Sequence, residues 1–322
     1  MRQGEIMLEV KDLTKHFDAR GQRGKVIHAL DGASFAIKKG KTLGLVGESG
    51  CGKSTCARTV IRIYEPTKGK IFLDGCDITN LSKEQMLPHR RRMQMIFQDP
   101  YASLNARMTV HDIIAEPLRA HNICRSRAEE NELIGDMLRR VGLTEEHAGR
   151  YAHEFSGGQR QRVGIARAII LKPDLVICDE PISALDVSIQ AQIVNMLREL
   201  QHELGMSYLF IAHDLSMVRY VSDDVGVMYM GNIVEMCEAD EIYTNPLHPY
   251  TKGLLSSIPI PDPRLARQKQ SASLEGDLPS PIDPPPGCRF HTRCPYASDV
   301  CRNEIPALKD AGGGHMVACH RV

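Results

Sequence analysis

Short apolar runs, separated by polar turn segments, recur along the first 257 residues of the chain. Residues 42–46, 175–178 and 208–212 form such runs, which are typical of strands buried on both faces of a parallel sheet. Residues 7–10 and 33–37 alternate apolar and polar side chains instead. That alternation predicts strands with one buried face.

Apolar residues at helical spacing predict helices between these strands. Residues 110–150 carry two such patterns, and Gly142 is placed to cap the second. Helices are also expected over 56–61, 163–170 and 186–204, the second of them ended by a Lys-Pro pair. Strands that alternate with helices in this way predict an α/β fold.

Turn sequences predict two reversals of the chain. Asp74-Gly75 closes a strand that starts at residue 69, and Gly231-Asn232 joins strands at 225–230 and 233–235. A basic run at 89–92 is expected to be a solvated face before a further strand at 93–97.

The chemistry is concentrated first in residues 47–55, GESGCGKST, which lie between a predicted strand and a predicted helix. Glycines in such a loop let backbone N–H groups face a polyphosphate, and the helix N-terminus adds partial positive charge. Lys53 would then reach the β- and γ-phosphates, and Ser54 would hold Mg²⁺. A turn that only joins strand to helix would not need Lys and Ser at these places. The predicted phosphate-binding residues are Gly47, Glu48, Ser49, Gly50, Cys51, Gly52, Lys53, Ser54 and Thr55.

Further polar residues come at the ends of predicted elements. Ser156, Gly157, Gly158 and Gln159 open a helix and make a second potential anion site. Asp179 and Glu180 end a buried strand, where ligands of open parallel sheets bind. Phe17 has a flat ring that would suit an adenine base, although a core position explains it equally well. The remaining candidates at element ends are Gln98, Asp186 and His213.

Composition narrows the class of protein. The formal net charge is zero, which argues against broad nucleic-acid binding, and no run of eighteen apolar residues is present to span a bilayer. The N-terminus lacks the apolar core of a signal peptide, so a cytoplasmic location is expected. Eight of the eighteen prolines fall between 258 and 287, which predicts an extended connector.

Ten cysteines are unevenly placed. Six are expected to be small apolar filler, namely Cys51, Cys56, Cys76, Cys124, Cys178 and Cys237. The other four, Cys288, Cys294, Cys301 and Cys319, have the spacing C-x₅-C-x₆-C-x₁₇-C, and disulfides between them are not expected in a cytosolic chain. Thiolate sites suit zinc or an iron–sulfur cluster, and the short C-x₂-C pairs of structural zinc sites are absent. His291, His315 and His320 are possible substitute ligands.

The motifs together resemble the ATP-binding-cassette ATPases over residues 1–257, and residues 156–159 resemble that family's signature motif. The resemblance implies a RecA-like phosphate-loop core, an N-terminal antiparallel β subdomain, and a helical signature subdomain at about 105–165. It implies ATP and Mg²⁺ as ligands, with Asp179 and Gln98 near Mg²⁺, Glu180 as the general base and His213 on the γ-phosphate. It also implies head-to-tail pairing, in which Ser156 and Gly158 meet the nucleotide of a second subunit and Asp186 couples the two sites.

The segments IFQDPYASLN at 96–105, CDEPISALDVSIQAQ at 178–192 and HPYT at 248–251 are similar to the F-type ATPase subunits of dipeptide and oligopeptide importers. Ala106 departs from that family, which often has Pro there. The resemblance extends into a cysteine-rich C-terminal region at 258–322 and favours a 4Fe–4S cluster over zinc. It implies a second, D-type ATPase, two transmembrane permease subunits and an extracytoplasmic peptide-binding protein, with this chain peripheral on the cytoplasmic face of the membrane. A soluble cassette ATPase acting on DNA or the ribosome is the alternative, but such proteins carry coiled-coil insertions or two cassettes.

Overall fold

The computed structural model describes residues 5–19, 21–22, 24–213, 215–258 and 276–322. Its contacts divide the chain into two compact units. The first unit contains residues 1–8, 37–41 and 73–211, and the second contains residues 9–36, 42–72 and 212–322. The separate domain boundary that composition suggests at residue 257 stays a prediction.

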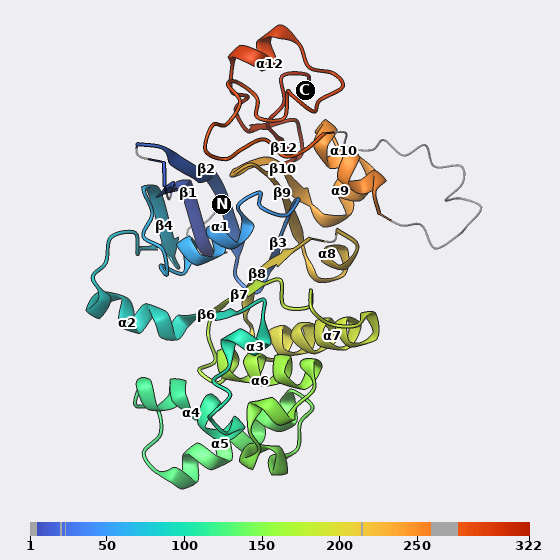
Figure 1. The fold of residues 1–322 in the computed structure, drawn as a ribbon. Coiled ribbons are helices and arrows are strands. Elements are labelled where there is room, and N and C mark those ends of the chain that lie inside the picture. Colours follow the sequence, from blue (N-terminus) through green and yellow to red (C-terminus); the bar gives the residue numbers. More distant parts are fainter. Residues whose placement is uncertain (1–4, 20, 23, 214, 259–275) are drawn as a thin grey trace, which may run out of the picture. The chain divides into compact units, whose positions relative to one another are not determined.

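The first unit combines a short parallel sheet with most of the helices (Figure 1). Its elements are β5 (Cys76–Asp77), α2 (Lys83–Arg92), β6 (Met93–Ile96), α3 (Pro100–Ser103), α4 (Val110–Ala120), α5 (Arg127–Arg140), the 3₁₀ turns η2 (Glu145–Gly149) and η3 (Ala152–Glu154), α6 (Gly157–Ile169), β7 (Leu175–Asp179), α7 (Val187–Leu204) and β8 (Ser207–Ala212). β7 pairs in parallel with β6 on one side and with β8 on the other. Every residue of β7 and β8 is buried, which explains their unbroken apolar runs.

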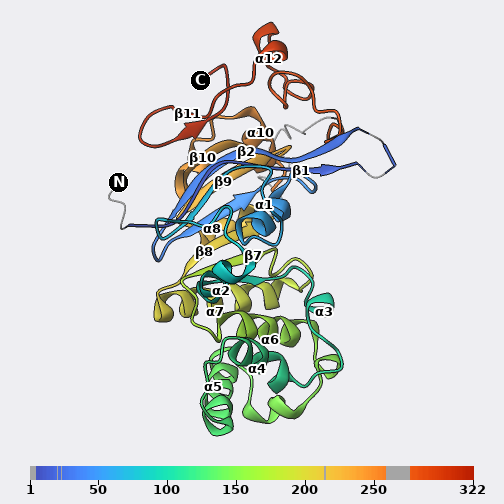
Figure 2. The same ribbon diagram turned by 90° about the vertical axis from the view of Figure 1, so that its left-hand side faces the viewer.

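The helical part of this unit follows the predicted pattern. Thr109 and Ser126 accept backbone hydrogen bonds as N-caps of α4 and α5, and α5 ends before Gly142, whose φ is +72°. The apolar faces of α4 and α5 are buried, and α4 and α6 pack closely (Figure 2). The basic run is not wholly solvated, because Arg92 pairs with Asp74 and Asp174.

The second unit carries two sheets and the C-terminal tail. Its elements are β1 (Ile6–Asp18), β2 (Val26–Lys38), β3 (Thr42–Val46), α1 (Lys53–Val60), β4 (Lys68–Leu73), α8 (Leu215–Val221), β9 (Asp224–Tyr229), β10 (Asn232–Glu238), α9 (Ala239–Thr244), α10 (Pro249–Ser256), α12 (Asp299–Asn303), β11 (Lys309–Asp310) and β12 (Met316–Val317). One sheet has the order β2-β1-β4. In the other, β3 is parallel to β9, and β10 pairs antiparallel with both β9 and β12.

Two boundaries differ from the prediction, each for a local reason. The hairpin turns at Met230-Gly231, where φ is +44° and +80°, and Asn232 already pairs with Tyr229. α1 begins at Lys53 rather than near residue 56, because Gly52 in a left-handed conformation ends the loop directly at the helix. Most of the proline-rich connector lies outside the described residues, and its described end, 276–287, forms turns without a helix or strand.

Candidate nucleotide site and cysteine-rich tail

The phosphate loop joins β3 to α1 and contains two glycines, Gly47 and Gly52, at which any side chain would force neighbouring backbone atoms to move. A Cβ on Gly47 would lie 2.2 Å from the Met228 carbonyl oxygen, and one on Gly52 would lie 2.3 Å from that of Ala29. Both glycines also have positive φ values. α1 has no acidic residue in its first turn, so its N-terminal partial charge is not neutralised locally. The loop is thus shaped and polarised for an anion.

Lys53 lies inside the curve of this loop. Its ammonium donates to the carbonyl oxygens of Gly47 at 2.7 Å and Glu48 at 3.0 Å, and its side chain is buried. His213 Nδ1 lies 3.5 Å from Lys53 Nζ. The structure therefore brings two of the predicted phosphate contacts together within the second unit. Ser49 and Gly50 form the exposed rim, and Ser54 and Thr55 are half-buried in the first turn of α1.

Phe17 is half-buried on β1 rather than part of the core. Its ring packs edge-on against Tyr64 at 5.2 Å, and the Lys15 ammonium lies 4.8 Å from the ring centroid. An aromatic pair with one accessible side fits a stacking platform. Its role in holding adenine stays a prediction.

The predicted catalytic carboxylates lie in the first unit. Asp179 is the last residue of β7 and Glu180 follows it, with exposed fractions of 0% and 4%. Glu180 has a φ of +49°, which turns the chain sharply as it leaves the sheet. Gln98 Nε2 donates to Glu180 Oε2 at 2.6 Å, so the structure brings together the predicted base and a residue predicted to lie near Mg²⁺.

The signature turn caps α6 in the same unit. Ser156 and Gln159 form a capping box, in which the Gln159 N–H donates to Ser156 Oγ and the Ser156 N–H donates to Gln159 Oε1. Ser156 Oγ accepts within its own turn, so its O–H is left to donate outward from an exposed position. A Cβ on Gly158 would lie 2.8 Å from a methyl group of Ile189, so any larger residue there would force Ile189 to shift.

Asp186 is the exposed N-cap residue of α7. The next residue, Val187, is 79% exposed, and the nearby Tyr101 ring is 61% exposed with the Arg160 guanidinium 4.0 Å from its centroid. Val187 and Tyr101 are therefore exposed apolar side chains of the first unit.

The four tail cysteines lie in one part of the second unit. Burial raises the pKa of Cys288 to about 11, and the three other tail thiols lie close enough to raise it further. The backbone near Phe290 and Tyr296 acts in the opposite direction and lowers the pKa values of Cys288 and Cys294, but burial outweighs it. Every cysteine in the chain is an unpaired thiol.

Among the other six cysteines the filler prediction is right for Cys51, Cys56, Cys178 and Cys237, which are buried. It is wrong for Cys76, which is exposed, and for Cys124, which is half-buried. Each follows or precedes a turn, where an apolar residue need not reach the core.

His315 is not grouped with the four tail cysteines but lies with Cys237 and Glu241, whose ligand atoms fall within 4.8 Å of its own. Its Nε2 lies 2.7 Å from Glu235 and its Nδ1 lies 3.0 Å from Glu241. Burial alone would lower the pKa of His315, but the two carboxylates outweigh burial and raise it. An imidazolium between two carboxylates therefore fastens the tail to β10 and α9. His291 and His320 each contact a backbone carbonyl oxygen.

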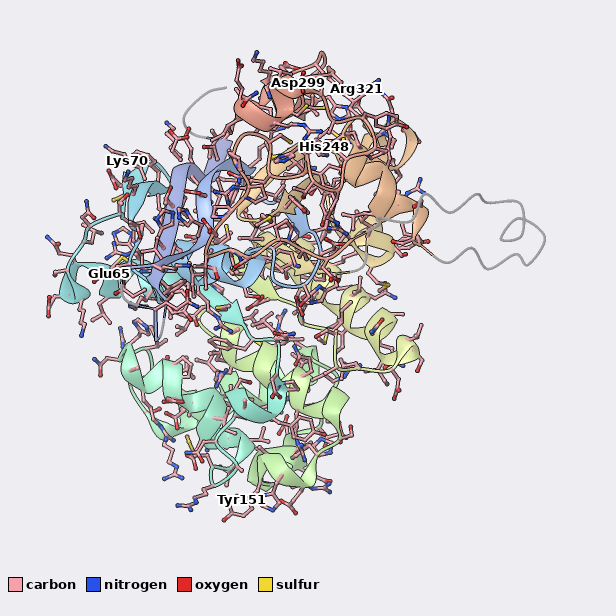
Figure 3. The ribbon with its side chains drawn as sticks, turned by 45° about the horizontal axis from the view of Figure 1, so that its top comes forward. Glu65, Lys70, Tyr151, His248, Asp299 and Arg321 are labelled. Carbon is pink, nitrogen blue, oxygen red and sulfur yellow. The ribbon has the colours of Figure 1, made fainter. Side chains whose placement is uncertain are left out.

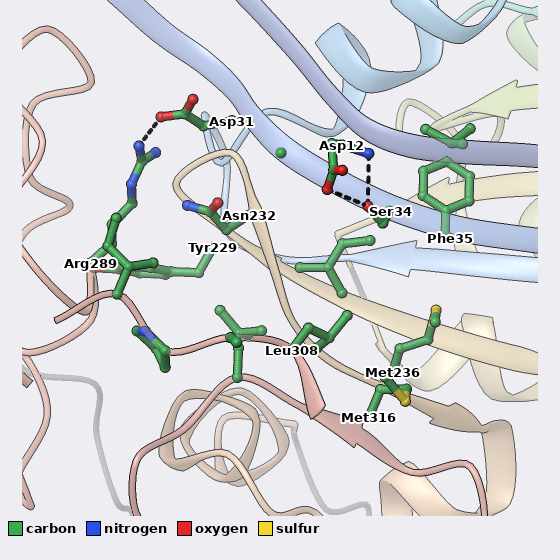
Figure 4. A pocket seen from close by; sticks show the side chains of 18 of the residues that line it. Asp12, Asp31, Ser34, Phe35, Tyr229, Asn232, Met236, Arg289, Leu308 and Met316 are labelled. Atoms are coloured by element: carbon green, nitrogen blue, oxygen red, sulfur yellow. Dashed lines mark hydrogen bonds and ion pairs between the residues drawn. The ribbon is translucent and has the colours of Figure 1, made fainter. Parts of the chain in front are cut away.

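A cavity of about 660 Å³ lies between the tail, β10 and the β1–β2 hairpin, all within the second unit (Figure 4). Arg289 reaches Asp31 across it. His16 and His28 also contact Asp31, at 3.0 and 3.1 Å, and these contacts outweigh burial to lower the pKa of its carboxyl. Near this cavity His248, labelled in Figure 3, is buried, and burial lowers its pKa to about 4. Neutral His248 then accepts from the Tyr250 N–H.

Sequence reasoning missed Tyr250 and Arg293. The Tyr250 hydroxyl accepts from the Glu48 N–H at 2.9 Å, and Arg293 forms a two-pronged ion pair with the Glu48 carboxylate. The signals in the sequence are that Tyr250 belongs to the HPYT segment and that Arg293 precedes a tail cysteine, and neither reveals a contact with Glu48.

The chain belongs to the ATP-binding-cassette transporter ATPases. The family model described as "ABC transporter" matches residues 30–183, and the model described as "Oligopeptide/dipeptide transporter, C-terminal region" matches residues 234–301. The chain is 55% identical, over 98% of its length and 97% of the relative, to the oligopeptide transport ATP-binding protein AppF of Bacillus subtilis. It is 51% identical, over 100% and 98%, to the oligopeptide transport ATP-binding protein OppF of Salmonella typhimurium.

Solved cassette structures have a similar fold. The ATP-binding cassette MJ0796, in a dimeric post-hydrolysis state bound to ADP and Pi, superposes with a TM-score of 0.66 and 26% identity, covering 72% of this chain and 99% of MJ0796. The comparison confirms the predicted cassette core. This chain is therefore an ATPase of the cassette family. None of the helices in the described part of the chain is long and apolar enough to cross a bilayer.

Proposed function

We propose that this chain is the ATP-hydrolysing motor subunit of an importer for oligopeptides or dipeptides. The observation that carries the proposal is the phosphate loop curved around Lys53, in a chain whose tail matches the oligopeptide-transporter C-terminal region. ATP binding closes a head-to-tail pair of cassettes, and hydrolysis reopens it. The chain works at the cytoplasmic face of the membrane with two permease subunits and a separate peptide-binding protein.

In this proposal, Lys53, Ser54 and the loop N–H groups hold the phosphates and Mg²⁺, and Asp179 is a further ligand of Mg²⁺. Glu180 accepts a proton from the attacking water, with Gln98 orienting the Glu180 carboxylate. His213 steadies the γ-phosphate.

Pairing completes the site. Ser156 and Gly158 of a second subunit donate to the γ-phosphate, and the exposed surface around Val187 becomes covered. We infer that the partner is a D-type paralogue, so that two different ATPases form the pair.

For the tail cysteines we propose a 4Fe–4S cluster rather than zinc. Thiolates around zinc, with Zn–S bonds of about 2.3 Å, lie about 3.8 Å apart. Among the described residues, the two groups of three ligand atoms that fall within 4.8 Å of one another contain none of the four tail cysteines. Thiols that are close to one another but wider apart than zinc requires suit a larger cluster. When bound, the cluster would fasten a tail that has little regular structure of its own.

The test is reconstitution of the copurified complex in proteoliposomes. Peptide should accumulate only when MgATP is supplied on the side of the membrane where this chain lies. Glu180→Gln in this subunit should abolish that accumulation. Mass spectrometry of the copurified proteins should show one further ATPase and two permeases. Iron and acid-labile sulfide near one cluster per chain are expected under anaerobic handling, whereas stoichiometric zinc would refute the cluster.

A further inference from the structure

We propose that the cysteine-rich tail regulates nucleotide binding through Arg293, a positioning residue that holds the phosphate loop by its Glu48 side chain. This inference rests on the proposed ATPase function and adds to it a control element. The tail would act on the loop directly, within the second unit, without a separate regulatory domain.

The contact between tail and loop is specific in geometry. Arg293 Nη1 lies 2.7 Å from Glu48 Oε2, and Nη2 lies 3.0 Å from Oε1. A fork of two parallel hydrogen bonds fixes both the position and the rotation of the carboxylate. The Arg293 side chain is only 5% exposed, so water screens this pair weakly.

Glu48 is well placed to pass this constraint to the nucleotide site. Its carbonyl oxygen accepts from Lys53 Nζ at 3.0 Å and from the Cys51 N–H at 3.2 Å. Its own N–H donates to the Tyr250 hydroxyl. Glu48, which Arg293 binds through its side chain, therefore also forms part of the backbone around Lys53. The Lys53 ammonium is the group predicted to contact the phosphates.

The other end of the contact is tied to the thiols. Arg293 immediately precedes Cys294, and its N–H donates to the Phe290 carbonyl oxygen at 3.0 Å. Phe290 is 1% exposed and packs against Tyr229 and Tyr250, with ring centroids 5.3 and 5.4 Å away. Metal bound at Cys288 and Cys294 would hold both ends of the segment that carries Arg293. Without that metal the segment would depend on its turns, the packing of Phe290 and the Arg289 contacts to keep the guanidinium in place.

A second contact of the same segment supports the assignment. Arg289, next to Cys288, donates to Asp31 on the β1–β2 hairpin and to the Met230 carbonyl oxygen. Arg293 thus reaches the loop itself, and Arg289 reaches β2 and the β9–β10 turn, two parts of the chain that lie against Gly52 of the loop. This arrangement is expected if metal bound by the tail cysteines fixes the two arginines and thereby changes the affinity of the loop for ATP.

The experiment measures ATP affinity of the purified full-length chain by equilibrium titration with a fluorescent ATP analogue. Arg293→Gln should weaken binding at least about fivefold, the lower end of ordinary coupling between two sites. The matched control is Arg302→Gln, because Arg302 also adjoins a tail cysteine but its side chain is exposed. Arg293→Lys should give an intermediate loss, since it keeps the charge without the fork. Hydrogen exchange of the amides at 47–52 should be faster in Arg293→Gln than in wild type.

A double variant tests whether the effect passes through the pair. Adding Glu48→Gln to Arg293→Gln should weaken binding little beyond either single change. Additive losses would assign the two residues independent roles and overturn the proposal.

Removal of the tail metal supplies the second test. Chelation should weaken ATP binding by wild type to the level of Arg293→Gln, and should leave Arg293→Gln unchanged. An equal further loss in both would show that the metal acts by another route. If wild type binds no ATP, the proposed function fails. If wild type binds ATP and Arg293→Gln binds equally well with unchanged amide exchange, only the regulatory inference fails.

Discussion

Replacement of Glu180 by glutamine should separate ATP binding from hydrolysis. Glu180 is 4% exposed, and its Oε2 accepts a hydrogen bond from Gln98 at 2.6 Å. A glutamine at this position has the same shape, and its amide oxygen can still accept from Gln98. The change therefore removes the negative charge and the proton acceptor but keeps the contact.

The expected magnitude follows from what is lost. A positioned general base contributes about 100- to 10,000-fold to a reaction rate, so hydrolysis should slow by that factor. This corresponds to about 2.7 to 5.5 kcal/mol in the barrier. The loop around Lys53 is untouched, and the affinity for MgATP should change by less than about threefold. Because a buried charge is removed, stability should not fall.

The assay is steady-state phosphate release by the assembled complex, with nucleotide affinity and the thermal unfolding midpoint measured on the same preparations. Glu199→Gln is the control, since it makes the same chemical change at an exposed position on α7. Wild-type hydrolysis by the Glu180 variant would refute its role as base. Loss of both binding and hydrolysis would show that the carboxylate serves the structure instead.

Three further changes test the loop and the tail. Gly52→Ala should weaken ATP binding at least about tenfold in a nucleotide titration, because its Cβ would lie 2.3 Å from the Ala29 carbonyl oxygen, whereas Gly50→Ala has open space and should be milder. The raised pKa of His315 means that its stabilisation is complete below its unfolded value of about 6.5 and is lost as pH rises through the folded value. The midpoint of thermal unfolding should therefore decrease as pH rises above about 6.5 in wild type. The decrease should be smaller in His315→Gln. Phe290→Ala should cost about 3–5 kcal/mol in denaturant unfolding, and a cost below about 1 kcal/mol would contradict the packing described.

The parts of the site that sequence could predict are those whose chemistry is local. The loop at 47–55 needs a strand before it and a helix after it, and both are visible as periodicity. β3 accordingly has the predicted bounds, and Asp179 lies at the end of β7 as expected. Gln98 and Glu180 were each singled out by the family resemblance, but their direct hydrogen bond is known only from the structure.

Contacts between residues far apart along the chain could not be predicted. Arg293 and Glu48 are 245 positions apart, and Tyr250 and Glu48 are 202 apart. No spacing rule connects such residues, since only the completed fold brings them together. The hairpin turn was misplaced by one residue for a different reason. Met230 adopts a positive φ, which is uncommon for a residue other than glycine and so is not expected from the sequence.

The pairing of β12 with β10 has a consequence for the handling of the protein. β10 is flanked by β9 on one side and by β12 on the other, and the Ala318 N–H extends the ladder to the Val234 carbonyl oxygen at 2.8 Å. A shortened cassette that lacks the tail would leave that side of β10 open, with Ile233 and Val234 in a strand ready to pair with another molecule. Such a fragment should aggregate even when its nucleotide site is intact. The tail therefore also prevents aggregation by covering the edge of β10.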